Sequence, residues 1–173
     1  VTDGSGSSDS GSSDSGSSGS GSSSGGITVS GGYSGGSSGG TSTGSTSTSG
    51  ASATISAGSE DQDITGTSGD DTVTFEAAED AEEFNSLDLS GGDDLVILED
   101  MDDDLTPEDL NNVENVEVQV DTAGKTLDMS NAGDDIEKLT VDANSKTITI
   151  NNVDAIDTVA VTDAGSNLVT IED

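Results

Sequence analysis

The 173-residue chain contains no cysteine, histidine, tryptophan or arginine. These absences exclude disulfides and thiol chemistry, imidazole acid–base catalysis, Cys/His zinc sites and arginine clamps, so most enzyme classes lose their usual side chains. Aromatic residues make up only 2% and hydrophobic residues 28% of the chain, so any core is thin and aliphatic or covers only part of it. The longest aliphatic run, Leu95 to Leu98, is too short to cross a bilayer.

Positive charge is almost missing, because three lysines stand against 36 aspartates and glutamates, a formal net charge of -33. Nucleic acid and anionic membrane surfaces would repel such a chain, so neither is expected as a partner, and no membrane insertion is expected. One alternative stays open for this acidity: adaptation to a high-salt habitat, where acids without lysine keep a surface hydrated.

The composition changes near Gly58. Residues 1–50 contain 16 Gly and 21 Ser, and residues 1–58 hold only three acids. Such a segment buries too little apolar surface to offset its ordering entropy. We therefore expect residues 1–58 to be a Ser/Gly-rich low-complexity tail or linker and residues 59–173 an acidic domain. Two strand-like segments interrupt the tail, Ile27–Val29 and Ala53–Ile55, and either could pair with a sheet edge or a neighbouring molecule.

Downstream of Thr72, short strands rich in Val, Ile, Leu and Thr alternate with Asp, Asn and Gly. The expected strands are residues 72–75, 87–89, 95–98, 116–120, 126–129, 138–141, 147–150, 158–161 and 168–171. Alternate strands in the second half are 20 or 21 residues apart, a repeat of about twenty residues with two strands in each. Antiparallel sandwiches also place strands every 8 to 12 residues, but the near-constant two-strand period favours a solenoid.

The predicted fold is therefore all-β, a parallel β-solenoid of the β-roll or β-helix kind, in which alternate residues form an aliphatic ladder inside. One inward face would hold Val116 or Val118 with Leu139, Val141, Val159 and Val161. The other would hold Leu127, Met129, Ile148, Ile150, Val169 and Ile171. Two short helical excursions are expected, at residues 76–84 and 102–113, where Thr106 and Pro107 give a helix-start signal.

Three turns before strands share a Gly-Asp-Asp sequence. Glycine permits a tight turn, and paired carboxylates after it place hard oxygen donors beside turn carbonyls. Calcium takes six to eight such oxygens at about 2.3–2.6 Å, so the turns predict Ca²⁺ sites; the competing interpretation is that the acids only cap turns. The candidate ligands are Gly69, Asp70, Asp71, Gly92, Asp93, Asp94, Asp134 and Asp135.

The segment Gly66-Thr67-Ser68-Gly69-Asp70-Asp71-Thr72-Val73 resembles a degenerate unit of the RTX, or haemolysin-type, calcium-binding repeats. The stretches Leu110–Val116 and Thr126–Asn131 are similar to strand-ladder regions of bacterial S-layer proteins. The likeness covers roughly residues 64–173, without a tandem Gly-Gly-x-Gly-x-Asp array. It implies a calcium-stabilised β-roll exported by type I secretion, hence a secreted, cell-surface location.

We therefore expect a non-enzymatic extracellular structural protein, a calcium-stabilised solenoid that assembles as a homo-oligomer or polymer into a surface layer or filament. An adhesin stalk or binding module of a larger secreted protein is the alternative, with a cell-surface polysaccharide left open as partner. A polysaccharide-active β-helix enzyme is a further alternative, because paired carboxylates can hydrolyse glycosides. The three lysines and few aromatics give that enzyme little to hold a sugar with.

Overall fold

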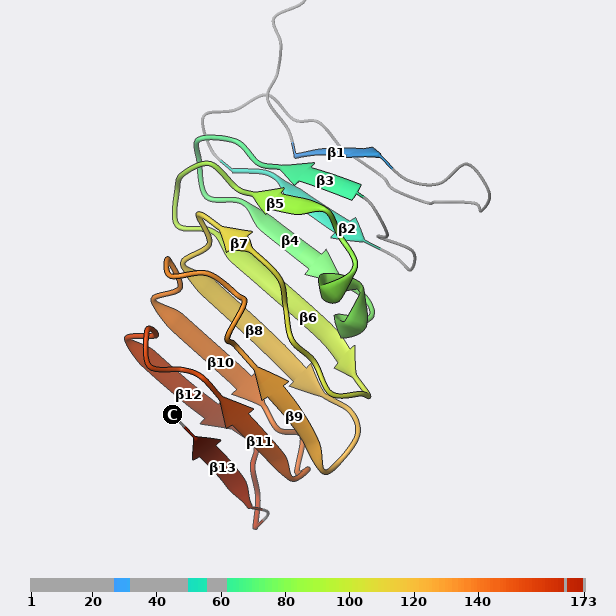
Figure 1. Ribbon diagram of the computed structural model, residues 1–173, viewed down its shortest axis with the longest axis vertical. Coiled ribbons are helices and arrows are strands. Elements are labelled where there is room, and N and C mark those ends of the chain that lie inside the picture. Colours follow the sequence, from blue (N-terminus) through green and yellow to red (C-terminus); the bar gives the residue numbers. More distant parts are fainter. Residues whose placement is uncertain (1–26, 32–49, 56–61, 167, 173) are drawn as a thin grey trace, which may run out of the picture.

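The computed structural model describes residues 27–31, 50–55, 62–166 and 168–172, with side chains omitted for residues 28–31 and 53. Nearly all of its regular structure is β-strand, wound into a parallel β-solenoid of about five turns. Figure 1 shows the result as a rod made of two facing layers of strands. The expected fold class is confirmed. We use "coil" for one turn of this solenoid, one strand from each layer with its connections.

One layer is a single six-stranded sheet in which every neighbouring pair runs parallel. Its strands, from one end of the rod to the other, are β2 (Ser52–Ile55), β4 (Thr72–Phe75), β6 (Leu95–Met101), β8 (Asn115–Val120), β10 (Lys138–Asp142) and β12 (Thr158–Thr162). Because chain neighbours are never sheet neighbours, each strand returns to this layer only after crossing the opposite one. That is the topology the two-strand period predicts.

The opposite layer is divided into two sheets. The first contains β1 (Thr28–Gly31), β3 (Gln62–Thr65), β5 (Ser86–Asp88) and β7 (Leu110–Asn111). The second contains β9 (Lys125–Asp128), β11 (Ile148–Asn151) and β13 (Val169–Glu172). Strands β8 and β9 belong to different layers, so they form no antiparallel hairpin. A single parallel bridge from Leu105 to Leu127 extends the second sheet toward the first.

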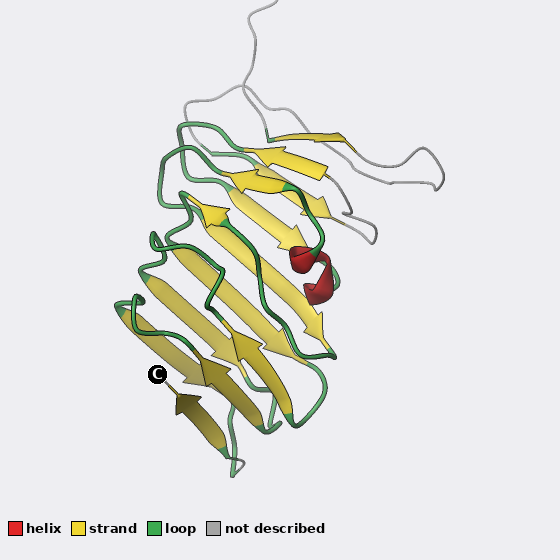
Figure 2. Ribbon diagram, viewed as in Figure 1, coloured by secondary structure: helices red, strands yellow, loops and turns green. Residues whose placement is uncertain are grey.

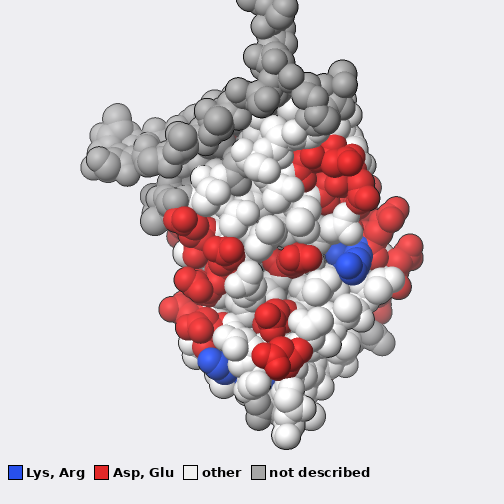
Figure 3. Space-filling model, turned by 180° about the vertical axis from the view of Figure 1, so that it is seen from behind, with Lys and Arg blue, Asp and Glu red and all other residues white. Residues whose placement is uncertain are grey.

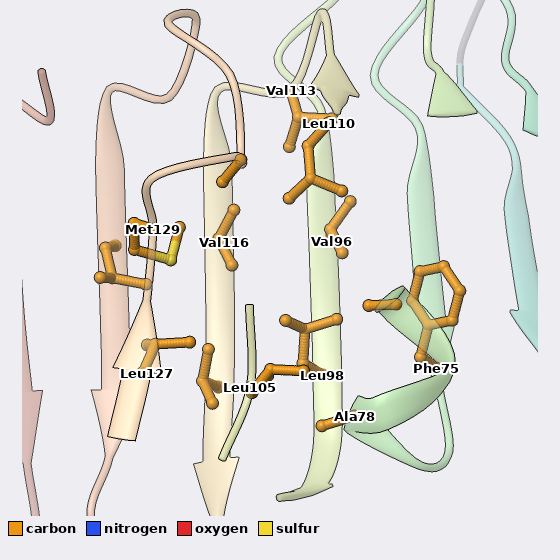
Figure 4. Packing of buried hydrophobic residues seen from close by; sticks show 14 of the residues in the cluster. Phe75, Ala78, Val96, Leu98, Leu105, Leu110, Val113, Val116, Leu127 and Met129 are labelled. Carbon is orange, nitrogen blue, oxygen red and sulfur yellow. The ribbon is translucent and has the colours of Figure 1, made fainter. Parts of the chain in front are cut away.

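The core lies between the layers and is almost wholly aliphatic, as Figure 4 shows for Leu98, Leu105, Leu110 and Leu127. Phe75 and Phe84 stack with ring centroids 5.9 Å apart, so both phenylalanines of the chain pack together near η1. Most of the expected inward residues are buried: Val116, Val118, Leu127, Met129, Leu139, Val141, Ile148 and Ile150. In the last coil Val159, Val161 and Val169 are only partly buried, and Ile171 is exposed.

Both strand-like segments of residues 1–58 belong to the sheets. Ser52–Ile55 forms β2 and pairs in parallel with β4, while Thr28–Gly31 forms β1 and pairs antiparallel with β3. The sheets therefore contain residues on both sides of position 58. The β1–β3 pair is the antiparallel one among the described strands, and it lies at the end of the rod away from the C-terminus (Figure 1).

One helical excursion is confirmed and the other is wrong. Residues Ala78–Glu82 form the 3-10 helix η1, red in Figure 2, within the expected stretch 76–84. Residues 102–113 form no helix. The backbone groups of Leu105 pair instead with Thr126 and Asp128, and the Thr106 N–H donates to Glu82 of η1. Contacts with neighbouring coils therefore replace the i to i+4 bonds that Thr106 and Pro107 would have started.

The two faces of β6 give a direct test of this core. Leu98 is buried between the layers, whereas its neighbour Ile97 lies on the other face of the same strand and is partly exposed. We expect Leu98→Ala to lower the free energy of unfolding by about 2–5 kcal/mol, because it leaves a cavity. Ile97→Ala, the matched control, should cost at most about 1 kcal/mol. Urea denaturation measures both, and equal losses would contradict the assignment of faces.

Candidate functional site

Two of the three Gly-Asp-Asp turns stack directly on each other. The turn at residues 69–71 precedes β4 and the turn at 92–94 precedes β6, and the register of these strands pairs Thr72 with Leu95. The backbones meet so closely that a Cβ on Gly92 would lie 2.7 Å from the carbonyl carbon of Gly69. Any larger residue at position 92 would push the two turns apart.

The second acid of each turn binds backbone of the preceding coil. Asp94 Oδ1 accepts the Asp71 N–H at 2.6 Å, and Asp71 Oδ1 accepts the Ala51 N–H at 2.6 Å. Glu114, at the same place in the next coil, accepts the Asp94 N–H at 2.8 Å. One acid in each coil therefore satisfies an N–H twenty or more residues earlier. We call Asp71, Asp94 and Glu114 the carboxylate column.

The first acids of these turns form a second set of contacts. Asp70 Oδ1 accepts the Asp93 N–H at 3.0 Å, and Asp93 Oδ1 accepts Asn115 Nδ2 at 2.6 Å. Here each carboxylate reaches the following coil, so these bonds run opposite to those of the carboxylate column. Together the two sets tie four successive coils at the N-terminal ends of β2, β4, β6 and β8.

The third Gly-Asp-Asp turn is out of register with the first two. Lys138 pairs with Asn115, and Asn115 pairs with Leu95, so Glu137 occupies the place of Asp94. Asp134 and Asp135 stand two residues earlier, and Asp135 Oδ2 accepts the Asn112 N–H at 3.3 Å. The structure thus brings Gly69–Asp71 and Gly92–Asp94 together and leaves Asp134 and Asp135 outside that arrangement.

The third turn instead lines an open groove of about 900 Å³. Its walls carry acids from three coils, with buried Met129 and Ile136 among the lining side chains. The acids that line it are Glu108, Asp109, Asp134, Asp135 and Asp154. Lysine is absent from the groove's lining, so the groove presents negative charge alone.

Asp94 is the electrostatically unusual member of the carboxylate column. Its side chain is fully buried, and Oδ2 has no hydrogen-bond partner. Burial is the largest cause that raises the pKa of Asp94 from 3.8 to about 6, and the carboxylates of Asp71, Glu114 and Asp70 add to the increase. The Asp71 N–H, which favours the charged form, offsets only part of it.

A bound calcium ion requires six to eight oxygens at about 2.3–2.6 Å. The carboxylates of Asp70, Asp71 and Asp93 already accept hydrogen bonds, and Asp94 Oδ2 is the one buried oxygen of these turns without a donor. Within the ranges that the structure covers, no group of three or more acidic side chains is placed to hold a metal ion. In the structure these carboxylates accept hydrogen bonds from neighbouring coils, and calcium binding at the turns stays a prediction.

The sequence interpretation missed a second type of inter-coil contact. Asp88 Oδ1 accepts the Ser90 N–H at 2.9 Å and Asn112 Nδ2 at 2.8 Å. Asp128 does the same with Ser130 and Asn152, and these two bonds lower its pKa, the Ser130 N–H most. The sequence carries this signal as a repeat of forty residues. Leu-Asp-Leu-Ser at 87–90 and Leu-Asp-Met-Ser at 127–130 are each followed, about twenty residues later, by Asn-Asn-Val at 111–113 and 151–153.

Acidic groups also cluster where η1 meets the loop at residues 102–106. Glu79 Oε1 accepts the N–H groups of Asp102 and Asp103, and its negative charge is the main reason that the pKa of Asp102 is raised. Lys125 forms an ion pair with Asp103 at 2.7 Å. Figure 3, from the side opposite to Figure 1, shows how strongly acidic side chains outnumber lysines on that face of the described residues.

Comparison of the chain with protein-family models, curated proteins and solved structures finds no match. Among the residues described, no helix is long and apolar enough to cross a membrane.

Two adjacent glycines test the stacking of the turns. Gly92→Ala forces a Cβ against the backbone of Gly69, whereas a Cβ on Gly91 meets no atom within 4 Å. We expect Gly92→Ala to lower the free energy of unfolding by about 1–3 kcal/mol and Gly91→Ala to change it little. Thermal unfolding followed by circular dichroism measures both variants, and equal melting temperatures would contradict the close stacking.

The pKa of Asp94 predicts a pH dependence of stability. Because the pKa is raised from 3.8 to about 6, folded Asp94 keeps its proton between these values while the unfolded chain loses it. The contribution of Asp94 to stability is therefore greatest below the unfolded pKa and declines as pH rises to about 6. Asp94→Asn should reduce this decline and raise stability at neutral pH, by at most about 3 kcal/mol.

Urea denaturation at several pH values between about 4 and 7 measures this effect. The exposed acid Asp154 provides the control, because Asp154→Asn removes one charge outside the column. A stability profile that is the same for Asp94→Asn and the unmodified chain would show that Asp94 does not titrate in this range.

Proposed function

We propose that the chain is a non-enzymatic structural protein of the cell exterior, a stiff β-solenoid that assembles into a surface layer or filament. The proposal rests on the hydrogen bonds that the acidic side chains of the chain accept. In the carboxylate column Asp71, Asp94 and Glu114 accept backbone N–H groups of neighbouring coils. Carboxylates that hold coils together in this way stabilise a rod, and they are poorly placed to act on a substrate.

The same contacts weigh against the polysaccharide-active enzyme. Glycoside hydrolysis needs two carboxyl groups facing a substrate cleft, one to protonate and one to attack or activate water. Asp71 and Asp94 are buried and face backbone donors. The acidic groove at Asp134 and Asp135 offers no lysine or aromatic side chain to hold a sugar.

An adhesin stalk is the second candidate, and the shape of the molecule favours it. The described strands stack in one direction, with β1 and β13 at opposite ends of the opposite layer (Figure 1). Such a rod could separate a binding domain from a surface. The surface-layer proposal and the stalk proposal share the secreted location and differ in whether copies of the chain associate.

Calcium belongs to the proposal as a stabilising counter-ion. The net charge of -33 opposes folding through self-repulsion, and Asp94 adds a buried carboxylate with one oxygen that lacks a donor. A divalent cation beside Asp94 would relieve both costs. This role needs fewer ligands than the coordination shell that the Gly-Asp-Asp turns suggested.

Removal of calcium tests this part. At low ionic strength we expect a chelator to lower the melting temperature by several degrees, roughly what 1 kcal/mol changes in a domain of this size, and added Ca²⁺ to restore it. Asp94→Asn should reduce the calcium effect, whereas the control Asp154→Asn should preserve it. If NaCl of matched ionic strength restores stability as well as Ca²⁺, the high-salt explanation of the acidity replaces the calcium proposal.

Assembly is tested separately. Residues 1–26 precede the described strands, so their removal leaves β1 and all later strands in place. If the Ser/Gly-rich tail takes part in assembly, light scattering in millimolar calcium should show weaker association for the truncated chain than for the full chain. Equal association would remove residues 1–26 from the mechanism, and a full chain that stays monomeric would remove the polymer.

A further inference from the structure

The last coil of the rod differs from all the others in its exposure. Strands β12 and β13 each have one neighbour, because each is the final strand of its sheet. Leu168 is 71% and Ile171 48% exposed, and these two are the large exposed hydrophobic side chains among the described residues. Apolar side chains that are gathered at an open edge favour a partner that covers them.

The hydrogen bonds of β12 show which of its backbone groups are available. Thr158 donates its N–H to the Glu137 carbonyl, and the Thr162 carbonyl accepts the Ala143 N–H, both at 3.0 Å. Residues 158, 160 and 162 therefore direct their backbone groups toward β10. Because direction alternates along a strand, the N–H and C=O groups of Val159 and Val161 point to the open edge.

Strand β13 follows the same rule. The Leu168 carbonyl accepts the Ile148 N–H at 3.4 Å, and the Glu172 carbonyl accepts the Asn152 N–H at 3.0 Å. The backbone groups of Val169 and Ile171 therefore point away from β11. Val159, Val161, Val169 and Ile171 thus share two properties. Their N–H and C=O groups point to the open sheet edge, and their apolar side chains face the core but are incompletely covered.

The sequence of β12 is symmetric. Thr158-Val159-Ala160-Val161-Thr162 reads the same in both directions. If two copies of β12 pair antiparallel about Ala160, Val159 of each copy lies opposite Val161 of the other. These residues carry the outward N–H and C=O groups, so the pair forms the closely spaced hydrogen bonds of an antiparallel ladder. One register therefore pairs the valine side chains and also forms the backbone hydrogen bonds.

Strand β13 allows the same pairing about Thr170. Val169 of one copy then lies opposite Ile171 of the other, so both inward positions remain apolar. Strand β13 is not symmetric, because the same register places Leu168 of one copy opposite Glu172 of the other. Its two inward positions nevertheless match, so both edge strands of the last coil can take part in the contact. The Val159, Val161, Val169 and Ile171 side chains of both copies then complete one continuous core.

Charge favours a second copy at this edge over other parts of the surface. Thr158–Thr162 carries no charge in a chain of net charge -33, so the paired residues of β12 bring no carboxylates together. The acids that flank the strand, Asp157 and Asp163, then lie opposite each other, and salt reduces their repulsion. The strand also lacks the lysine, proline or bulge that usually protects an edge. Head-to-tail stacking is less favourable, because at the other end the antiparallel strand β1 covers β3 and breaks the parallel order that β13 would continue.

We propose that the last coil is the contact surface for a second copy of this chain, with β12 pairing antiparallel to β12 about Ala160 and β13 to β13 about Thr170. The proposal deepens the assembly part of the proposed function by naming one contact. Its test adds no calcium and changes residues of β12 and β4 alone, so its failure and the failure of the proposed function can be told apart.

Sedimentation equilibrium of the full chain in about 0.15 M salt, where charge is screened beyond roughly 8 Å, provides the first measurement. We expect a dimer whose dissociation constant rises at least about tenfold in Ala160→Glu, because the two new carboxylates face each other across the symmetry axis. Thr74→Glu is the matched control, since Thr74 lies on the same outer face in the interior strand β4. It should dimerise like the unmodified chain.

A cysteine variant distinguishes the arrangements, since the chain has no cysteine of its own. In the proposed pairing Ala160 lies opposite itself in a non-hydrogen-bonded pair, with Cα atoms about 4.5 Å apart, within the range that a disulfide bridges. Ala160→Cys should therefore form covalent dimers under mild oxidation, and Thr74→Cys should not.

Several outcomes would overturn the proposal. A full chain that remains monomeric at all accessible concentrations shows that another part of the chain covers the edge or that it stays open. Open-ended oligomers without Ala160→Cys dimers show head-to-tail stacking. A dimer that Ala160→Glu leaves unchanged, with native circular dichroism in both variants, places the contact elsewhere.

Discussion

The paired residues of the parallel strands lie about 4.8 Å from their counterparts in the next coil, because the coils stack through hydrogen-bonded parallel strands. This spacing decides which side chains the chain can tolerate at each position. Apolar columns gain from it, since Val96, Val116 and Leu139 stack on one another inside the rod. Acidic columns lose from it, since like charges at this distance repel.

The acids at the coil edges meet this constraint by accepting hydrogen bonds. Asp71, for example, accepts the N–H groups of Ala51 and Thr67. The same bonds satisfy N–H groups that would otherwise be exposed at the corner between turn and strand. Asp94 shows what the arrangement costs, because burial and three neighbouring carboxylates leave it with a raised pKa.

The sequence predicts the coil period well because hydrophobic alternation and spacing depend on local composition. It predicts register less well. The Gly-Asp-Asp sequence at 133–135 looks like the other two, yet it lies two residues out of line with them, and only the pairing of Lys138 with Asn115 reveals this. The helix expected from Thr106 failed for a related reason, because Leu105 pairs with β9 and Thr106 with η1. Both the out-of-line turn and the missing helix depend on contacts with neighbouring coils, which no local signal encodes.

Burial along the rod is graded. Val141 is buried, its counterpart Val161 is partly exposed, and Ile171 in the facing layer is half exposed. In a stack where each coil contacts only its neighbours, stability is nearly a sum over coils and interfaces. Local unfolding therefore begins at the last coil and proceeds coil by coil. Amide protons of β12 and β13 are expected to exchange with solvent before those of β6 and β8. In a single copy the last coil is therefore the mechanically weak part of the described rod, and a pulling force would separate it from β10 and β11 first.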